Sequence, residues 1–346
     1  MSYVPNAFLE YTSEMNFCER FWNTVNTLIE KIFYEFFHLP NQKRLYEKYF
    51  PNAQNSFKSV IKNSSIVFIN RHVNSFGSTP RLPNMIDIGG LHVKQKEDLD
   101  KRYQKYLDSA KNGVIVFSMG SIIQGMDWEE PQRDAFVSAF AKLKQRVLWK
   151  YENKTLPNNP GNIKVSKWLP QRDILAHPNV KLIITHGGLL SLFEAEVEGV
   201  PVLAIPAFGD QKMNAANAVR RGYALKLDYN DITEENISAA INELLTNPTY
   251  KENAMKASTE FKDRPMTPKI AVYYWTTYAF KHRGAPHLRI AGNDLSFIQL
   301  NSLDVYLSII ALIASAFFIV FSVCKMIIKR IFKKKNVSKK HKKKSK

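Results

Sequence analysis

The chain has 346 residues, 45% of them hydrophobic, and a formal net charge of +18. This composition excludes a wholly disordered chain and allows one large domain or two ordinary ones. The charge alone is typical of a nucleic-acid binder, but 12 of the 49 basic residues lie in 325–346, which leaves 37 basic and 31 acidic residues elsewhere. The positive excess therefore belongs mostly to a tail, and we expect no nucleic-acid partner.

The first third of the chain predicts helices and short strands. Aromatic and aliphatic residues recur with helical spacing from Glu14 to Leu39, which predicts one amphipathic helix, or two in sequence, ending before Pro40. Residues 43–62 predict another helix, interrupted by Pro51. Short strands are expected at 65–70 and within 85–93.

From residue 113 the pattern changes to short apolar strands that alternate with helices, after a polar linker that leads into a helix at 94–113. Strands are expected at 113–121, 146–151, 163–169, 180–186, 201–206 and 223–227. Helices are expected at 129–145, 171–176, 188–198, 211–221, 233–246 and 248–262. This alternation predicts an α/β fold with a parallel, doubly wound sheet.

Residues 305–324 contain no charged side chain, and their length is that of a membrane-spanning helix. The basic tail that follows is expected on the cytoplasmic side, which places residues 1 to about 300 on the other side. The opening residues have neither a basic start nor an apolar stretch typical of a signal peptide. Either the anchor directs insertion, or the natural N-terminus lies upstream.

In a parallel sheet, ligands bind beyond the carboxyl ends of the strands. There, His186-Gly187-Gly188 follows a strand and opens a helix, an arrangement that suits a phosphate group. Ser191 adds a hydroxyl in the first turn, and Glu194 lies one turn further, where a carboxylate can accept from ribose hydroxyls. A tight glycine turn beside an exposed Glu is the alternative. We favour a nucleotide-diphosphate site.

Other loops narrow the type of nucleotide. The strand–helix turns lack the G-x-G-x-x-G dinucleotide pattern, and Gly120 to Gly125 is not followed by the Lys-Ser/Thr of an ATP-binding loop. Trp168 ends a strand and offers a stacking face for a base, although core packing is equally consistent with its position. Asp210 and Gln211 suit sugar hydroxyls, although Asp210 could equally cap a helix.

Residues 167–211, KWLPQRDILAHPNVKLIITHGGLLSLFEAEVEGVPVLAIPAFGDQ, resemble the signature of the UDP-glycosyltransferases, the membrane-bound UDP-glucuronosyl and glucosyltransferases. The resemblance implies a GT-B fold with a complete Rossmann-like donor domain, a partial acceptor domain and a C-terminal transmembrane helix. The expected parts are an acceptor-domain remnant (1–93), a UDP-sugar-binding domain (94–275), a return segment (276–302), the transmembrane helix (303–328) and a basic cytoplasmic tail (329–346).

The resemblance also implies roles for single residues. Trp168 would stack on uracil, with Gln171 beside the base. The diphosphate would meet His186, Gly188 and Ser191, with Gly187 in the same turn and Ser121 nearby. Glu194 would bind the ribose, and Asp210 and Gln211 the sugar. The co-substrate would be UDP-glucose or UDP-glucuronate and the acceptor small and lipophilic, with no cofactor and no metal.

The family's catalytic histidine and its orienting aspartate lie in a region that precedes the part this chain resembles, so no catalytic residue is assigned. His92 is interpreted as structural, and Asp98-Leu99-Asp100 as a solvated face and not a metal site. The main hypothesis is an amino-terminally truncated, inverting UDP-glycosyltransferase. The alternative is a non-catalytic UDP-sugar-binding subunit that modulates a full-length partner, as a homo- or hetero-oligomer. Either would be a single-pass protein of the endoplasmic reticulum membrane with a luminal body.

Overall fold

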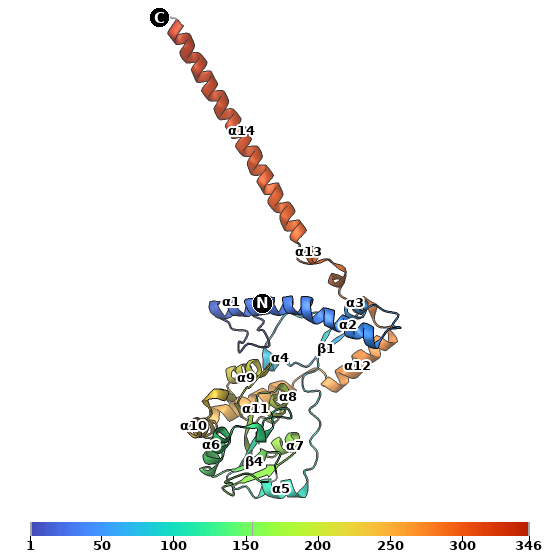
Figure 1. Cartoon of the computed structure of the whole chain (residues 1–346), viewed down its shortest axis with the longest axis vertical. Coiled ribbons are helices and arrows are strands. Elements are labelled where there is room, and N and C mark those ends of the chain that lie inside the picture. Colours follow the sequence, from blue (N-terminus) through green and yellow to red (C-terminus); the bar gives the residue numbers. More distant parts are fainter. Residues whose placement is uncertain (1, 154, 345–346) are drawn as a thin grey trace. The chain divides into compact units, whose positions relative to one another are not determined.

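The computed structural model describes residues 2–153 and 155–344 (Figure 1). Residues 345–346, the end of the predicted basic tail, lie outside the described residues. The chain forms two compact units, Met1–Leu288 and Arg289–Lys346. The first contains both sheets, and the second contains the long C-terminal helix.

A six-stranded, wholly parallel sheet is the centre of the first unit, with the order β5-β4-β3-β6-β7-β8. Its strands are β3 (Val114–Ser118), β4 (Arg146–Lys150), β5 (Ile163–Ser166), β6 (Val180–Thr185), β7 (Val202–Ala204) and β8 (Ala224–Lys226). All five residues of β3 are buried, as an apolar run in the middle of a parallel sheet requires. The strand order changes direction between β3 and β6, and such a switch point opens a crevice at the carboxyl ends of these strands.

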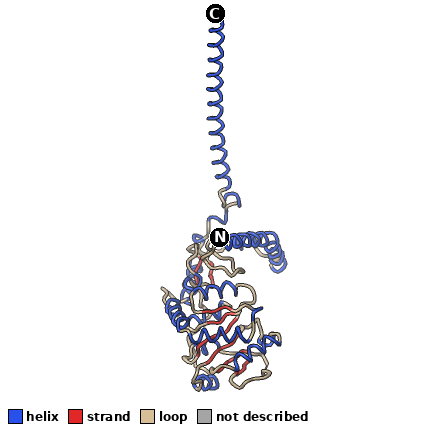
Figure 2. Tube along the Cα trace, turned by 90° about the vertical axis from the view of Figure 1, so that its left-hand side faces the viewer, coloured by secondary structure: helices blue, strands red, loops and turns tan. Residues whose placement is uncertain are grey.

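Helices cover both faces of this sheet, as Figure 2 shows with strands in red and helices in blue. One face carries α6 (Glu130–Ala141) and α10 (Glu234–Thr246), which pack on Phe117, Trp149 and their neighbours. The other face carries α5 (Lys101–Asp108), α7 (Gln171–Leu175), α8 (Leu189–Glu198), α9 (Gln211–Arg220) and α11 (Pro248–Lys262). Alternate residues of β3, β4, β6, β7 and β8 enter the two cores, whereas the apolar residues of β5 enter only the core that contains Phe117 and Trp149. This packing confirms the predicted doubly wound α/β arrangement.

The N-terminal part contains a two-stranded parallel sheet and several helices. Its elements are α1 (Phe17–Phe33), a π-helical turn (Tyr34–His38), α2 (Leu39–Tyr49), α3 (Phe57–Lys62), β1 (Val67–Ile69), α4 (Val73–Phe76) and β2 (Met85–Asp87). Asn16 caps α1 in a reciprocal capping box with Glu19.

The predicted end of the first helix before Pro40 is wrong. The helical path continues through the π-helical turn into α2, where Pro40 occupies the first turn. The first turn tolerates proline because its N–H groups need no partner inside the helix, and the wider π turn has already shifted the hydrogen-bond register. The N–H of Leu39 accordingly donates to the carbonyl of Tyr34, five residues earlier.

Many apolar side chains of α1 and the π turn are exposed. Phe17, Trp22, Phe33 and Phe36 each have more than half of their surface accessible. A cluster of exposed apolar side chains of this kind is typical of an interaction surface.

Two further regions complete the chain. Helix α12 (Pro268–Lys281), absent from the sequence prediction, begins at a Thr267 cap, and short 3-10 helices lie at Gly125–Asp127, Tyr229–Asp231, Pro286–Leu288 and Ala291–Asp294. The second unit contains α13 (Phe297–Leu300) and α14 (Leu303–Lys344). Residues 303–330 of α14 are long and apolar enough to cross a membrane, in agreement with the predicted span.

Candidate functional site

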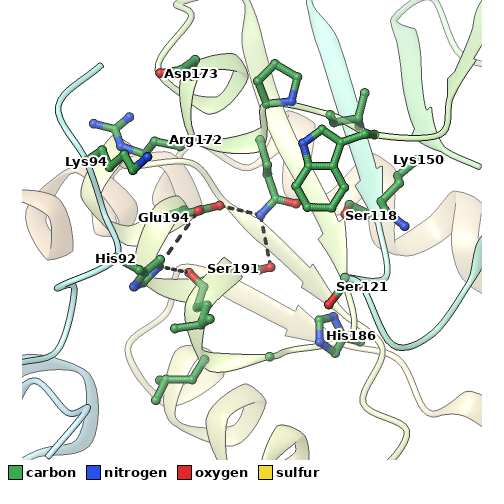
Figure 3. Close-up of a pocket in the computed structure, with 18 of the residues that line it drawn as sticks. His92, Lys94, Ser118, Ser121, Lys150, Arg172, Asp173, His186, Ser191 and Glu194 are labelled. Carbon is green, nitrogen blue, oxygen red and sulfur yellow. Dashed lines mark hydrogen bonds and ion pairs between the residues drawn. The ribbon is translucent and has the colours of Figure 1, made fainter. Parts of the chain in front are cut away.

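A cavity of about 690 Å³ opens at the carboxyl ends of the central strands (Figure 3). It gathers residues from the segments after β3, β5, β6 and β7, together with Lys150 at the end of β4 and the segment 92–97. Eight of the residues predicted for the donor site line it: Ser121, Trp168, Gln171, His186, Gly188, Ser191, Glu194 and Asp210. Residues more than 80 positions apart in the sequence therefore meet in one place.

The imidazole of His186 lies in a narrow slot between two glycines. A Cβ on Gly188 would collide with its Nε2 atom, and a Cβ on Gly120 would lie 2.6 Å from its Cε1 atom. Thr185 Oγ1 lies 3.2 Å from His186 Nδ1, and this hydrogen bond orients the ring. Gly187 has φ +76°, a conformation that favours glycine, and it makes the turn from β6 into α8 possible.

An amide-carboxylate pair forms another wall. Gln171, the first residue of α7, donates from Nε2 to Glu194 Oε2 across 2.7 Å and to Ser191 Oγ across 3.1 Å. Burial raises the pKa of Glu194, and the hydrogen bond from Gln171 and the charge of Arg172 partly offset this shift. The pair therefore joins α7 to α8 at the pocket wall.

Trp168 presents its ring to the solvent side of the pocket and is 68% exposed. Its backbone is held firmly, because its carbonyl accepts from Tyr103 Oη at 3.1 Å and from Ser166 Oγ at 2.9 Å. The interpretation of this Trp as a core residue is therefore wrong: it is a fixed platform with a free ring.

Asp210 and Gln211 differ in where their side chains lie. Asp210 lines the pocket and accepts from Asn214 Nδ2 at 2.8 Å, without forming a side-chain cap on α9. Gln211 is buried, and its Oε1 accepts the backbone N–H groups of Ala207 and Phe208 at 2.9 and 3.1 Å. Gly187 and Gln211 thus stand behind the pocket wall and shape its loops.

His92, which the sequence interpretation set aside as structural, lines the same pocket. Its Nε2 lies 3.1 Å from the carbonyl oxygen of Leu190 and 4.0 Å from Glu194 Oε1. Because a carbonyl only accepts, Nε2 carries the proton. Burial lowers the pKa of His92, and this hydrogen bond partly offsets the shift. The position of His92 after Gly89-Gly90 gave no signal for this contact.

Three cationic side chains that were not among the predicted site residues also line the pocket. Lys94, Lys150 and Arg172 all line it. Lys150 pairs with Glu152 at 2.9 Å, and Arg172 pairs with Glu198 at 2.8 Å. Glu97, Asp173, Glu194 and Asp210 line the same pocket, so its wall carries charges of both signs.

Within 2–153 and 155–344, no group of three or more His, Cys, Asp and Glu is placed to hold a metal ion. Asp100 of the Asp-Leu-Asp sequence has a structural role, since its Oδ1 accepts from the N–H of Arg102 at 2.7 Å and caps α5. The Asp-Leu-Asp sequence therefore ends in the N-cap of α5.

Comparison with known proteins decides the family. The model of the "UDP-glucoronosyl and UDP-glucosyl transferase" family matches residues 1–339. This chain belongs to that family. It is 42% identical over 321 residues to a UDP-glycosyltransferase UGT5 of Dactylopius coccus, covering 92% of this chain and 61% of that protein. It is 34% identical over 335 residues to human UDP-glucuronosyltransferase 2B15, covering 96% and 62%. The chain thus spans about three fifths of the length of these relatives.

Solved structures confirm the predicted GT-B fold. The glycotransferase of kitacinnamycin aligns with a TM-score of 0.56 and 19% identity, over 75% of this chain and 67% of that one. A UDP-glucose: anthocyanidin 3-O-glucosyltransferase, solved in complex with UDP, aligns with a TM-score of 0.53 and 18% identity, over 63% and 53%. At such identities these likenesses establish the fold of this UDP-glycosyltransferase family member and nothing finer.

Proposed function

We propose that the pocket binds a UDP-sugar, with the ten residues named from the sequence forming or shaping the donor site. The observation that carries this proposal is the convergence, in one cavity, of an exposed indole, a carboxylate and a glycine-lined helix start. The indole suits the base, the carboxylate suits the ribose, and the glycine-lined helix start suits the diphosphate.

Trp168 supplies the platform for uracil, and Gln171 lies beside it. Base stacking on an aromatic ring needs an open face, which the exposed ring of Trp168 provides. The Glu194 carboxylate accepts from the ribose hydroxyls, while its hydrogen bond from Gln171 keeps it oriented.

The diphosphate lies at the start of α8. The unpaired N–H groups of its first turn and the positive end of the helix dipole attract phosphate. Burial lowers the pKa of His186, with Asp210 partly offsetting the shift, so the ring is neutral near pH 7 and donates one hydrogen bond. Ser121 and Ser191 add hydroxyl donors nearby, and Figure 3 shows Ser121 next to His186.

The proposed reaction transfers a hexose or hexuronic acid to a small lipophilic acceptor with inversion at the anomeric carbon. The acceptor oxygen forms the new bond, its proton passes to a base, and the bond to the UDP oxygen breaks. The helix start and His186 stabilise the negative charge that develops on the leaving diphosphate. Asp210 orients the sugar hydroxyls, and Gln211 holds the loop that carries Asp210.

The expected domain division belongs to the same proposal. Residues 94–275 form the donor domain, residues 1–93 are part of an acceptor domain, and 276–302 lead to the membrane. The helix at Leu303–Arg330 supports a single-pass anchor, and we infer an endoplasmic reticulum location with a luminal body and a cytoplasmic tail.

A second candidate uses the same donor site without chemistry: a membrane-anchored UDP-sugar-binding subunit of a full-length relative. The exposed apolar face of α1 favours it, because that face is available to a partner. Transfer of sugar from UDP-glucose or UDP-glucuronate by the purified chain alone would exclude this candidate. Transfer only after addition of a full-length relative would support it.

Titration calorimetry of UDP into the full chain in detergent tests the donor site. We expect micromolar to millimolar binding that His186→Ala and Glu194→Ala both weaken by about tenfold or more. The matched controls are Glu234→Gln on α10, which pairs with Lys142, and Trp22→Ala on α1. A folded wild-type chain without UDP binding would refute the proposal.

A further inference from the structure

A buried glutamate lies on the helix that carries the donor site, but outside the pocket. Glu196 of α8 has a fully buried side chain and does not line the cavity that contains Ser191 and Glu194. Burying a carboxylate is costly unless other groups compensate it. Its partners therefore indicate what it holds in place.

The partners come from two segments outside α8. Glu196 Oε2 accepts from Ser75 Oγ of α4 at 2.7 Å, and Glu196 Oε1 lies 3.2 Å from Arg221 Nη1. Arg221 also donates to the backbone carbonyl of Asn74 and pairs with Glu260 at 2.7 Å. One carboxylate and one guanidinium thus join α4, α8 and α11.

Apolar contacts continue this junction to the pocket. Phe193 of α8 packs with Phe261 of α11, and Phe76 of α4 and Val93 pack against the same cluster. Val93 is next to His92, whose ring stacks on Phe193 with centroids 6.3 Å apart. The chain that leaves α4 therefore returns to α8 at the pocket wall.

We propose that Glu196 is a positioning residue for the donor site: it holds α4 against α8, and thereby seats His92 on the first turn of α8. This inference rests on the proposed UDP-sugar site. His92 reaches the carbonyl of Leu190, which lies between the diphosphate-binding start of α8 and Glu194. Loosening α4 displaces this contact and weakens UDP binding from a distance.

The charge state of Glu196 gives the proposal a specific readout. Burial raises its pKa to about 7, while the hydrogen bond from Ser75 and the charge of Arg221 offset part of the shift. The charged or titratable groups around it are Arg221 after α9, Tyr223 before β8, Glu260 on α11, and Arg264 after α11, and Ser75 on α4 faces it as a neutral donor. His72, which stacks on Phe261, has its pKa lowered to about 4 by burial and by Arg264 and Arg221, and stays neutral above pH 5.

The upward shift in the pKa of Glu196 determines how UDP affinity should change with pH. The pKa of Glu196 in the folded chain lies above its ordinary value of 4.5, so protonation favours the arrangement in which this side chain is buried between α4 and α8. The proton-linked part of this stabilisation is fully present below pH 4.5 and is lost as the pH rises through about 7, whereas the Ser75 hydroxyl donates to Glu196 in either state. UDP affinity should therefore fall with rising pH through this route.

The experiment is UDP titration into the full chain in detergent at several pH values from 5.5 to 8. Glu196→Gln keeps an acceptor for Ser75 and removes the titration, so the ratio of wild-type to variant affinity should fall by about threefold or more across this range. Ser75→Ala should weaken UDP at every pH. Glu234→Gln is the matched control, and titration of UDP itself cancels in the ratio.

Three outcomes are informative. Different pH profiles for wild type and Glu196→Gln, with weaker binding by Ser75→Ala, support the proposal. Parallel profiles and unchanged binding by Ser75→Ala overturn it and leave the proposed function standing. Absence of UDP binding by the folded wild type refutes both. Amide hydrogen exchange of residues 73–93 adds an independent readout, because Ser75→Ala should raise the exchange rate of this segment. An unchanged rate would contradict the proposal that Glu196 holds α4 against α8.

Discussion

The side-chain amide of Gln171 donates to the Glu194 carboxylate across 2.7 Å, which ties the first residue of α7 to the middle of α8. This carboxylate is mostly buried, and burial raises its pKa, so its charge costs stability near pH 7. A group that binds ligand and destabilises the unliganded fold is common at functional sites.

Glu194→Gln should therefore weaken UDP binding by about tenfold and leave the melting temperature unchanged or higher near pH 7. The wild type loses this part of its stability as the pH rises from 4.5 through the raised pKa, and the variant lacks that dependence. Calorimetry and thermal unfolding from pH 4 to 8 measure both effects. Equal UDP affinity for variant and wild type would contradict the ribose role.

Gly188→Ala should abolish measurable UDP binding with little loss of stability. The residue has φ −62°, which any amino acid adopts, so the damage comes from collision of the new methyl group with His186. A displaced ring would no longer face the proposed position of the diphosphate. Calorimetry together with a melting curve separates this effect from unfolding, and retained affinity would show that the position of His186 is unimportant.

Trp168→Ala should weaken UDP by about tenfold, consistent with a stacking contribution of about 1–2 kcal/mol, whereas Trp168→Phe should recover part of it. The exposed ring makes few contacts that the fold needs, so stability should change little. Trp22→Ala, another exposed tryptophan, serves as the control. Equal losses from Trp22→Ala and Trp168→Ala would argue against base stacking.

Deletion of residues 303–346 should move the chain from the membrane fraction to the soluble or peripheral fraction after alkaline extraction. The deleted segment contains Leu303–Arg330, the span whose apolar length matches a bilayer. Continued resistance to extraction would indicate that another surface, such as the apolar face of α1, anchors the body independently.

Much of the fold was predictable because burial imposes a simple pattern. The strands β3, β6 and β7 are short apolar runs, and the loops at their carboxyl ends could be named as the site before their geometry was known. Six of the eight predicted pocket residues follow those strands, and Trp168 and Gln171 follow β5. Pro40 was misinterpreted because a π-helical turn, which leaves no clear mark in sequence, precedes it.

Tertiary contacts explain the rest of the differences. Gln211 was predicted to face the sugar, yet its side chain folds back on the N–H groups of Ala207 and Phe208. His92 was dismissed because a lone histidine has no spacing to interpret, and its partner Leu190 lies 98 residues away. Such contacts depend on how segments pack, and sequence periodicity contains no information about that.

The pocket draws its walls from loops that follow most strands of one parallel sheet, and this governs when the site can exist during folding. Parallel pairing joins distant segments and is slow, so a nascent chain has no nucleotide site until β3, β6 and β7 have all been paired. UDP would then bind only completed molecules and draw the folding equilibrium toward them by mass action. At one hundred times its dissociation constant, UDP would add about 2.7 kcal/mol to the stability of the native state. Nucleotide supply in the compartment where the chain folds would thereby influence how much of it survives.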